Sequence, residues 1–249
     1  MRELLVLDGV WREFDRGAER GLAGVSLQLA VGEIGVVAGA RGSGKTTLLR
    51  VVGGMESPQR GVVRFCGRDL SGLSEGDRAR LLGGDIAWAS RTGPGRMQFK
   101  MLDYVGLPLI SGRRLRRREP ERRARAALKR LGVDGCAGLE WSELSGWQRV
   151  GVELAQAIVH RPALLLVDDL IDGLSMRHTR EAMRLIRSLA GEFGFGVLIA
   201  ASDLEPGMLA DRLWTLEEGE LTLLNEEDTE TDPVVIDLPK RRRASPGTR

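Results

Sequence analysis

Cysteine and long apolar runs are both scarce in this chain of 249 residues. Its two cysteines, Cys66 and Cys136, stand outside any CxxC or Cys/His cluster. A disulfide framework and a zinc site are therefore not expected, and both residues should be reduced, half-buried thiols. No stretch approaches the roughly 18 apolar residues of a membrane-spanning helix, and the N-terminus lacks the apolar core of a signal peptide. Any membrane role should therefore depend on a partner.

Aromatic residues and net charge are also low. Aromatics make up 4% of the chain and the formal net charge is +2. The few aromatics argue against a surface that stacks on the bases of single-stranded nucleic acid. The low net charge argues against an overall positive field that would attract nucleic acid. The apolar share of 42% and the charged share of 29% are ordinary for a soluble globular protein. The length suits one large α/β domain or two small ones, and it is sufficient to bury a sizeable core.

Short apolar runs alternate with helical patterns along most of the chain. The runs at residues 34–38, 163–167 and 196–201 are typical of strands in the middle of a parallel sheet. Helices are predicted at residues 45–52 and 178–189. This alternation indicates an α/β fold with a mostly parallel sheet.

Three further parts are expected around this core. Residues 4–10 and 24–31 predict an N-terminal layer of antiparallel strands. Residues 92–150, approximately, predict an inserted helical subdomain that carries the arginine-rich stretch SGRRLRRREPERRAR. This stretch could meet an acidic partner or lipid headgroups, or it could be a solvated helix face. The nucleotide-binding domain should span residues 1–224, and residues 225–249 should be a disordered charged tail.

A glycine-rich motif follows the first buried run. The sequence GARGSGKT fits G-x-x-x-x-G-K-[ST] at every fixed position, between a predicted strand and a predicted helix. Glycines let the backbone N–H groups face phosphate oxygens, and the helix adds its positive end. We therefore expect a P-loop NTPase core that binds ATP. The expected phosphate-binding residues are Gly39, Ala40, Arg41, Gly42, Ser43, Gly44, Lys45, Thr46 and Thr47.

The apolar run ALLLV ends in two adjacent acids, Asp168 and Asp169. A P-loop requires an acid at the end of a neighbouring strand to hold Mg²⁺, and burying two carboxylates without a cation is costly. The motif therefore predicts Mg²⁺ ligation by Thr46 and Asp168. A pair of capping acids at a strand end is the alternative.

Residues 144–148, LSGWQ, precede this acidic strand. They resemble the LSGGQ signature of ABC-type ATPases, and the resemblance extends over about residues 3–224. Within that family, the pattern looks most similar to macrolide-export and lipoprotein-release ATP-binding subunits. The resemblance implies that Ser145, Gly146 and Gln148 face the nucleotide bound by a second subunit. It also implies an aromatic residue that stacks on adenine, for which Phe14 fits best and Trp11 is a neighbour.

The chain departs from that family at five positions. The catalytic glutamate is replaced by Asp169, which is one methylene shorter and is expected to be a weak substitute. The glutamine after the strand at 85–89 aligns with Arg91, which could pair with phosphate but cannot ligate Mg²⁺. The histidine after the strand at 196–201 aligns with Ser202. Ser175 stands for an aspartate, and Trp147 for the second glycine of the signature. We therefore expect nucleotide binding with impaired hydrolysis.

The resemblance implies an ATP-binding subunit that works as a homo- or heterodimer beneath separate membrane-spanning subunits. Its place would be cytoplasmic, at the inner face of the cell membrane through that partner. Two alternatives stay open: a soluble ABC-type protein with a regulatory or nucleic-acid-associated role, and a non-hydrolysing pseudo-ATPase. Nucleic acid is not the expected partner, because no recognition fold accompanies the basic stretch.

Overall fold

The computed structural model describes residues 2–13, 21–95, 98–112 and 118–224. Its central six-stranded sheet is mostly parallel, as expected, and only the outermost pair, β10 and β9, is antiparallel. In spatial order the strands are β10 (Glu220–Leu224), β9 (Arg212–Glu217), β3 (Ile34–Ala38), β8 (Gly196–Ala201), β7 (Leu164–Asp168) and β6 (Ile86–Ser90). The sequence predicts strands at the positions of β3, β6, β7 and β8 and a last strand around residues 213–216, which corresponds to β9, but it does not predict β10.

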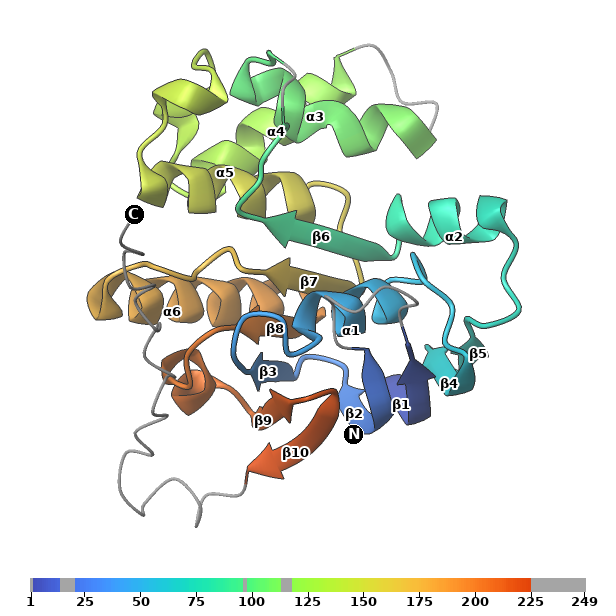
Figure 1. Cartoon of the computed structure of the whole chain (residues 1–249). Coiled ribbons are helices and arrows are strands. Elements are labelled where there is room, and N and C mark those ends of the chain that lie inside the picture. The colour runs from blue at the N-terminus through green and yellow to red at the C-terminus, as the bar shows by residue number, and fades with distance from the viewer. Residues whose placement is uncertain (1, 14–20, 96–97, 113–117, 225–249) are drawn as a thin grey trace, which may run out of the picture.

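The second sheet is antiparallel and confirms the expected N-terminal layer. It contains β2 (Leu22–Ala30), β1 (Glu3–Arg12), β4 (Arg60–Phe65) and β5 (Arg68–Asp69), in that order. In β2, alternate side chains are buried, as expected for a strand with one face on a core. This sheet lies at the lower right of Figure 1, to the right of β3, β9 and β10.

Helices cover both faces of the central sheet. Helix α1 (Lys45–Val52) packs with the antiparallel sheet in one apolar cluster, which also contains Leu164 and Leu166 of β7. Helix α6 (Met176–Phe193) belongs to a second cluster with Leu165 and Val167, the alternate residues of the same strand. Because successive strand residues point to opposite faces, β7 is buried on both sides. Helix α2 (Glu75–Leu82) and the short η3 (Glu205–Leu209) complete this part.

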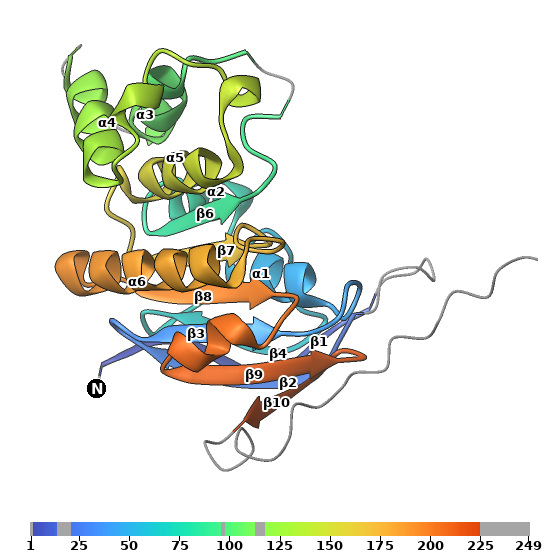
Figure 2. The same ribbon diagram turned by 90° about the vertical axis from the view of Figure 1, so that its left-hand side faces the viewer.

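The expected helical subdomain stands at one edge of the central sheet, beyond β6 (Figures 1 and 2). It consists of α3 (Met101–Gly112), α4 (Glu119–Arg130), η1 (Asp134–Cys136), η2 (Trp141–Glu143) and α5 (Gly146–Ile158). Helix α5 continues past the expected boundary near residue 150. Val150, Val152 and Leu154 are buried in the same cluster as α6, so this helix joins the subdomain to the core.

Some expectations fall elsewhere or cannot be placed. The cysteines are not both half-buried: Cys66 is exposed and Cys136 is buried. The difference follows from their positions, since Cys66 lies in the turn after β4, whereas Cys136 packs in the core of the subdomain. Phe14, most of the RRLRRR stretch (113–117) and the tail 225–249 lie outside the described residues.

Candidate nucleotide site

The glycine-rich loop connects β3 to α1 at the carboxyl end of the sheet. Gly44 is the N-cap of α1 and has φ 110°, a conformation that side chains with a Cβ rarely adopt. At Gly39, an added Cβ would lie 2.4 Å from the carbonyl oxygen of Leu216, so there is no room for a side chain between the loop and β9. These two glycines explain why the sequence forms a tight loop that opens directly into a helix.

Lys45 is the first residue of α1 and is 6% exposed. Its Nζ donates hydrogen bonds to the carbonyl oxygens of Gly39 (2.6 Å) and Ala40 (3.0 Å), so the ammonium group lies within the loop. Burial lowers the pKa of Lys45, while the nearby Asp169, Asp172 and Asp168 oppose that shift. A phosphate placed in the loop would add to this opposing effect, because a nearby negative charge favours the ammonium form.

Thr46 and Asp168 meet next to this lysine. The Thr46 hydroxyl donates to Oδ1 of Asp168 at 3.1 Å, which brings together two residues that are 122 positions apart in the chain. Burial raises the pKa of the Asp168 carboxyl, and the hydrogen bond from Thr46 counteracts that rise. A hydroxyl and a carboxylate at this separation offer two oxygen ligands to one cation.

Asp169 follows immediately and has φ 52°. This left-handed conformation is uncommon outside glycine, but aspartate and asparagine adopt it more readily than most residues. Burial raises the pKa of Asp169, and the neighbouring carboxylate of Asp172 raises it further. Sequence reasoning did not single out Asp172, although an acid three positions after Asp169 was a visible signal.

Asp172 contacts Arg91 and Ser202, the two residues aligned above with a glutamine and a histidine of the family. Nη1 of Arg91 donates to the carbonyl oxygen of Asp172 at 3.1 Å. The backbone N–H of Ser202 donates to both carboxylate oxygens of Asp172 (3.1 and 3.2 Å), and the Ser202 hydroxyl donates to Oδ2. The segments that follow β6, β7 and β8 are therefore linked through one residue.

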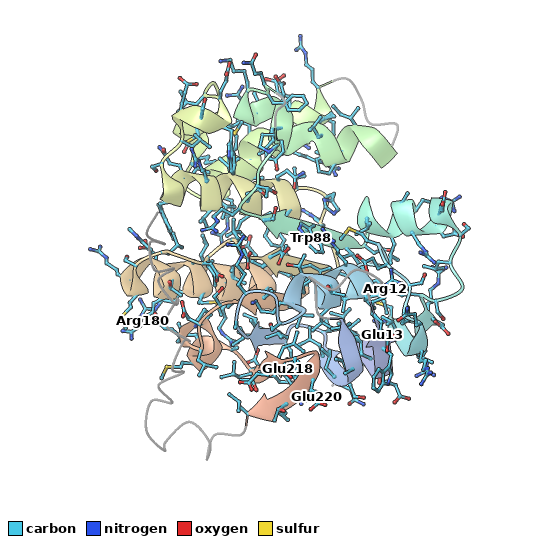
Figure 3. All side chains as sticks on the ribbon, in the orientation of Figure 1. Arg12, Glu13, Trp88, Arg180, Glu218 and Glu220 are labelled. Atoms are coloured by element: carbon cyan, nitrogen blue, oxygen red, sulfur yellow. The ribbon has the colours of Figure 1, made fainter. Side chains whose placement is uncertain are left out.

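A cavity of about 530 Å³ opens at this place. Its lining residues are Thr46, Arg50, Met55, Leu82, Trp88, Ser90, Arg91, Thr92, Asp168 and Asp169. Trp88 of β6 lies between the helical subdomain and α1 in the view of Figure 3. One end of the cavity is thus formed by Thr46, the two adjacent aspartates and Arg91.

The donor set fits a nucleotide with Mg²⁺. The buried Ser43 Oγ, inside the loop, makes no hydrogen bond to the described protein residues, as expected of a group that serves a ligand. Within the described ranges, no group of three His, Cys, Asp or Glu residues could hold a metal. Mg²⁺ is commonly held by one or two protein oxygens together with substrate phosphates. Thr46 and Asp168 would supply the protein oxygens here.

The signature residues lie at the start of α5, in the helical subdomain. Ser145 caps this helix: its Oγ accepts from the Gln148 backbone N–H (3.3 Å), and its own N–H donates to the Gln148 side chain (2.8 Å). Trp147 stacks on His178, with ring centroids 5.3 Å apart and planes inclined by 20°. None of these residues lines the cavity, so one chain brings together the P-loop and its acids but not the signature.

Two other sequence interpretations concern single residues. Ser175 is the N-cap of α6, with its side chain accepting from the His178 backbone N–H, so it has a local structural role. Trp11, the alternative to Phe14, is 38% exposed on β1. The buried pair of Tyr104 and Glu153 in the subdomain was not anticipated, since it depends on contacts between α3 and α5.

Comparisons with known proteins agree with this geometry. The family model described as ABC transporter matches residues 22–171. The aliphatic sulfonates import ATP-binding protein SsuB 2 of Agrobacterium fabrum is 35% identical, over 86% of this chain and 76% of its own length. The lipoprotein-releasing system ATP-binding protein LolD 2 of Caulobacter vibrioides is 34% identical, over 81% of this chain and 88% of its own.

A solved structure shares both the fold and the family. The ATP-binding cassette MJ0796, a dimer in a post-hydrolysis state with ADP and Pi, is 25% identical and has a TM-score of 0.79. The similarity covers 89% of this chain and 99% of that one. The macrolide-export and lipoprotein-release resemblance agrees with the LolD relatives. The chain therefore belongs to the ABC transporter family, among its ATP-binding subunits.

Proposed function

We propose that this chain binds ATP·Mg²⁺ in the P-loop and, paired with a second ATP-binding subunit, drives transport by separate membrane-spanning subunits. The observation that carries the proposal is the pairing of Thr46 with Asp168 at 3.1 Å, beside the buried Lys45. Lys45 would contact the terminal phosphates of a bound nucleotide, and Thr46 with Asp168 would hold the metal. Mg²⁺, when bound, offsets the charge on the phosphates.

The second subunit would complete the site. Ser145 and Gly146 open α5 at the surface of the subdomain, and a helix N-terminus is suited to contact a phosphate. These residues lie outside the cavity of their own chain, which supports a role on a neighbour's nucleotide. The dimeric relative MJ0796 supports the same arrangement. Within the described residues, no helix meets the length and hydropathy needed to span a bilayer. The relatives named above are ATP-binding proteins of an import system and a lipoprotein-releasing system, which supports placing the transport path in the partner and this chain at the cytoplasmic face of the membrane.

Hydrolysis should be slow. Asp169 is held at φ 52° with a carboxylate one methylene shorter than glutamate, and a displacement of about 1 Å costs on the order of a hundredfold in rate. Arg91 and Ser202, where the family has glutamine and histidine, are engaged with Asp172 instead. Binding is thus retained while the groups that act on the attacking water are altered.

The test compares the purified chain with Lys45→Ala. Calorimetric titration should give saturable binding of ATP·Mg²⁺ by the wild type and none by the variant. Phosphate release should be slow in the chain alone. Absence of nucleotide binding in the wild type would overturn the proposal. Rapid, steady turnover that is lost in Lys45→Ala would overturn the part that concerns impaired hydrolysis. Co-purification of a multi-spanning membrane protein tests the assignment of the partner.

A further inference from the structure

We propose that Arg91 is a ligand of the terminal phosphate and sets the preference of this site for a triphosphate over a diphosphate, with Asp172 and Ser202 as its positioning residues. This inference rests on the proposed ATP binding. Arg91 is a cation at a place where the family has a neutral glutamine. The proposed contact between its guanidinium and the terminal phosphate is therefore specific to this chain.

The negative charges of the aspartates and of a bound triphosphate exceed the positive charges of Lys45 and one Mg²⁺. Asp168, Asp169 and Asp172 all act electrostatically on Lys45, and two of these carboxylates, those of Asp168 and Asp169, line the cavity. A triphosphate brought there would meet this negative charge, and its terminal phosphate carries the charge that a diphosphate lacks. Lys45 and one Mg²⁺ offset only part of the total. A further cation at this end of the cavity would therefore favour close approach of the terminal phosphate.

Arg91 lies on the cavity wall and can supply this positive charge. It lines the cavity together with Thr46 and Asp169, and its positive charge acts on the Asp169 carboxylate. Arg50 also lines the cavity, but it lies 3.5 Å from Glu56 in an ion pair. Among the described residues on the cavity wall, Arg91 is thus the cation without a carboxylate partner at ion-pair distance.

The guanidinium of Arg91 is anchored in a way that leaves most of its donors available. Its one hydrogen bond within the described structure goes to the carbonyl oxygen of Asp172, so four of the five guanidinium N–H donors stay available. Asp172 is itself fixed by Ser202, whose N–H and hydroxyl both donate to its carboxylate. A guanidinium anchored through one donor keeps the fork that recognises phosphate oxygens.

The experiment measures dissociation constants for ADP·Mg²⁺ and for the β,γ-imido analogue of ATP with Mg²⁺, which avoids turnover. Wild type, Arg91→Gln and Arg91→Lys are compared by calorimetry. Arg91→Gln should weaken binding of the analogue by at least about tenfold, the scale of one charge-assisted hydrogen bond. The affinity for ADP should be nearly unchanged. Arg91→Lys should retain part of the preference, because it keeps the charge and loses the fork. Arg64→Gln, which removes one exposed guanidinium from β4, is the matched control.

The positioning role has its own readout. Ser202→Ala should reduce the preference for the triphosphate analogue without changing ADP affinity, and Ser202→Thr should restore it, because the hydroxyl is retained. Thermal unfolding without nucleotide separates these effects from loss of folding. Equal changes for both nucleotides in Arg91→Gln and Arg91→Lys, or no change, would overturn the inference while leaving ATP binding intact. Binding of neither nucleotide to wild type would overturn the proposed function as well.

Discussion

The phenol of Tyr104 on α3 donates a hydrogen bond of 2.6 Å to the carboxylate of Glu153 on α5. The other carboxylate oxygen accepts from the backbone N–H of Ser90 at 3.3 Å, directly before Arg91. Glu153 is 2% exposed, and its two hydrogen bonds join the helical subdomain to the end of β6. Burial raises the pKa of Glu153 to about 7, although the two hydrogen bonds lower it.

This raised pKa predicts a pH-dependent stability. Between pH 4.5, the ordinary pKa of a glutamate, and about pH 7, the folded chain binds more protons at Glu153 than the unfolded chain does. The free energy of unfolding should therefore decrease as pH rises through this window. Glu153→Gln should remove this part of the pH dependence and be more stable than wild type at pH 8, by roughly 1–3 kcal/mol. Denaturant unfolding at several pH values measures both effects.

The control for this prediction is Glu121→Gln, which neutralises an exposed carboxylate on α4. It should leave the difference between pH 5 and pH 8 unchanged. If Glu153→Gln keeps the slope of wild type, the Glu153 carboxyl titrates in its ordinary range and the burial argument is wrong.

The stack of Trp147 on His178 predicts an energetic coupling between the starts of α5 and α6. Each of Trp147→Ala and His178→Ala should destabilise the fold, and the double variant should lose less than the sum. The coupling should be about 0.5–1.5 kcal/mol, as for other stacked rings. A double-mutant cycle from denaturant unfolding gives this value. Additive losses would show that the two rings pack independently.

Thr46 predicts the dependence of nucleotide binding on Mg²⁺. In wild type, Mg²⁺ should strengthen ATP binding, because Thr46 and Asp168 supply two of its ligands. Thr46→Ala should bind ATP with little difference between added Mg²⁺ and EDTA. Calorimetric titration under both conditions checks this, with Thr222→Ala on the exposed β10 as the control. A full Mg²⁺ effect in Thr46→Ala would contradict the assigned ligand.

Asp169 predicts the direction in which hydrolysis can be changed. Asp169→Glu should raise turnover, by up to about a hundredfold if the longer side chain reaches the water. Because glutamate is less suited than aspartate to φ 52°, the same variant should lose about 1 kcal/mol of stability. Phosphate release and thermal unfolding are the two measurements. Asp169→Asn should abolish the residual turnover, and retained activity in that variant would place the acceptor of the water's proton elsewhere.

Much of the fold could be predicted because its signals are local. The apolar runs predicted β3 and β8 at their observed bounds, and the glycine-rich loop lies directly before the helix that it opens. Strand β10 was missed since ELTLL is short and lies at the sheet edge, where burial imposes little pattern. The subdomain boundary near residue 150 was misplaced, because α5 continues to Ile158 and its last turns are buried against the core.

Residue spacing along the chain was enough to indicate that a glycine-rich loop precedes a helix and that an acidic strand end accompanies it, and the resemblance implied five departures from the family pattern. These are properties of neighbouring residues and their spacing. Only the tertiary structure decided what the changed residues contact. Arg91, Asp172 and Ser202 meet because the parallel strands β6, β7 and β8 end at one edge of the sheet, and Trp147 meets His178 because two helices begin side by side. Such contacts depend on strand order and helix packing, which residue spacing does not specify.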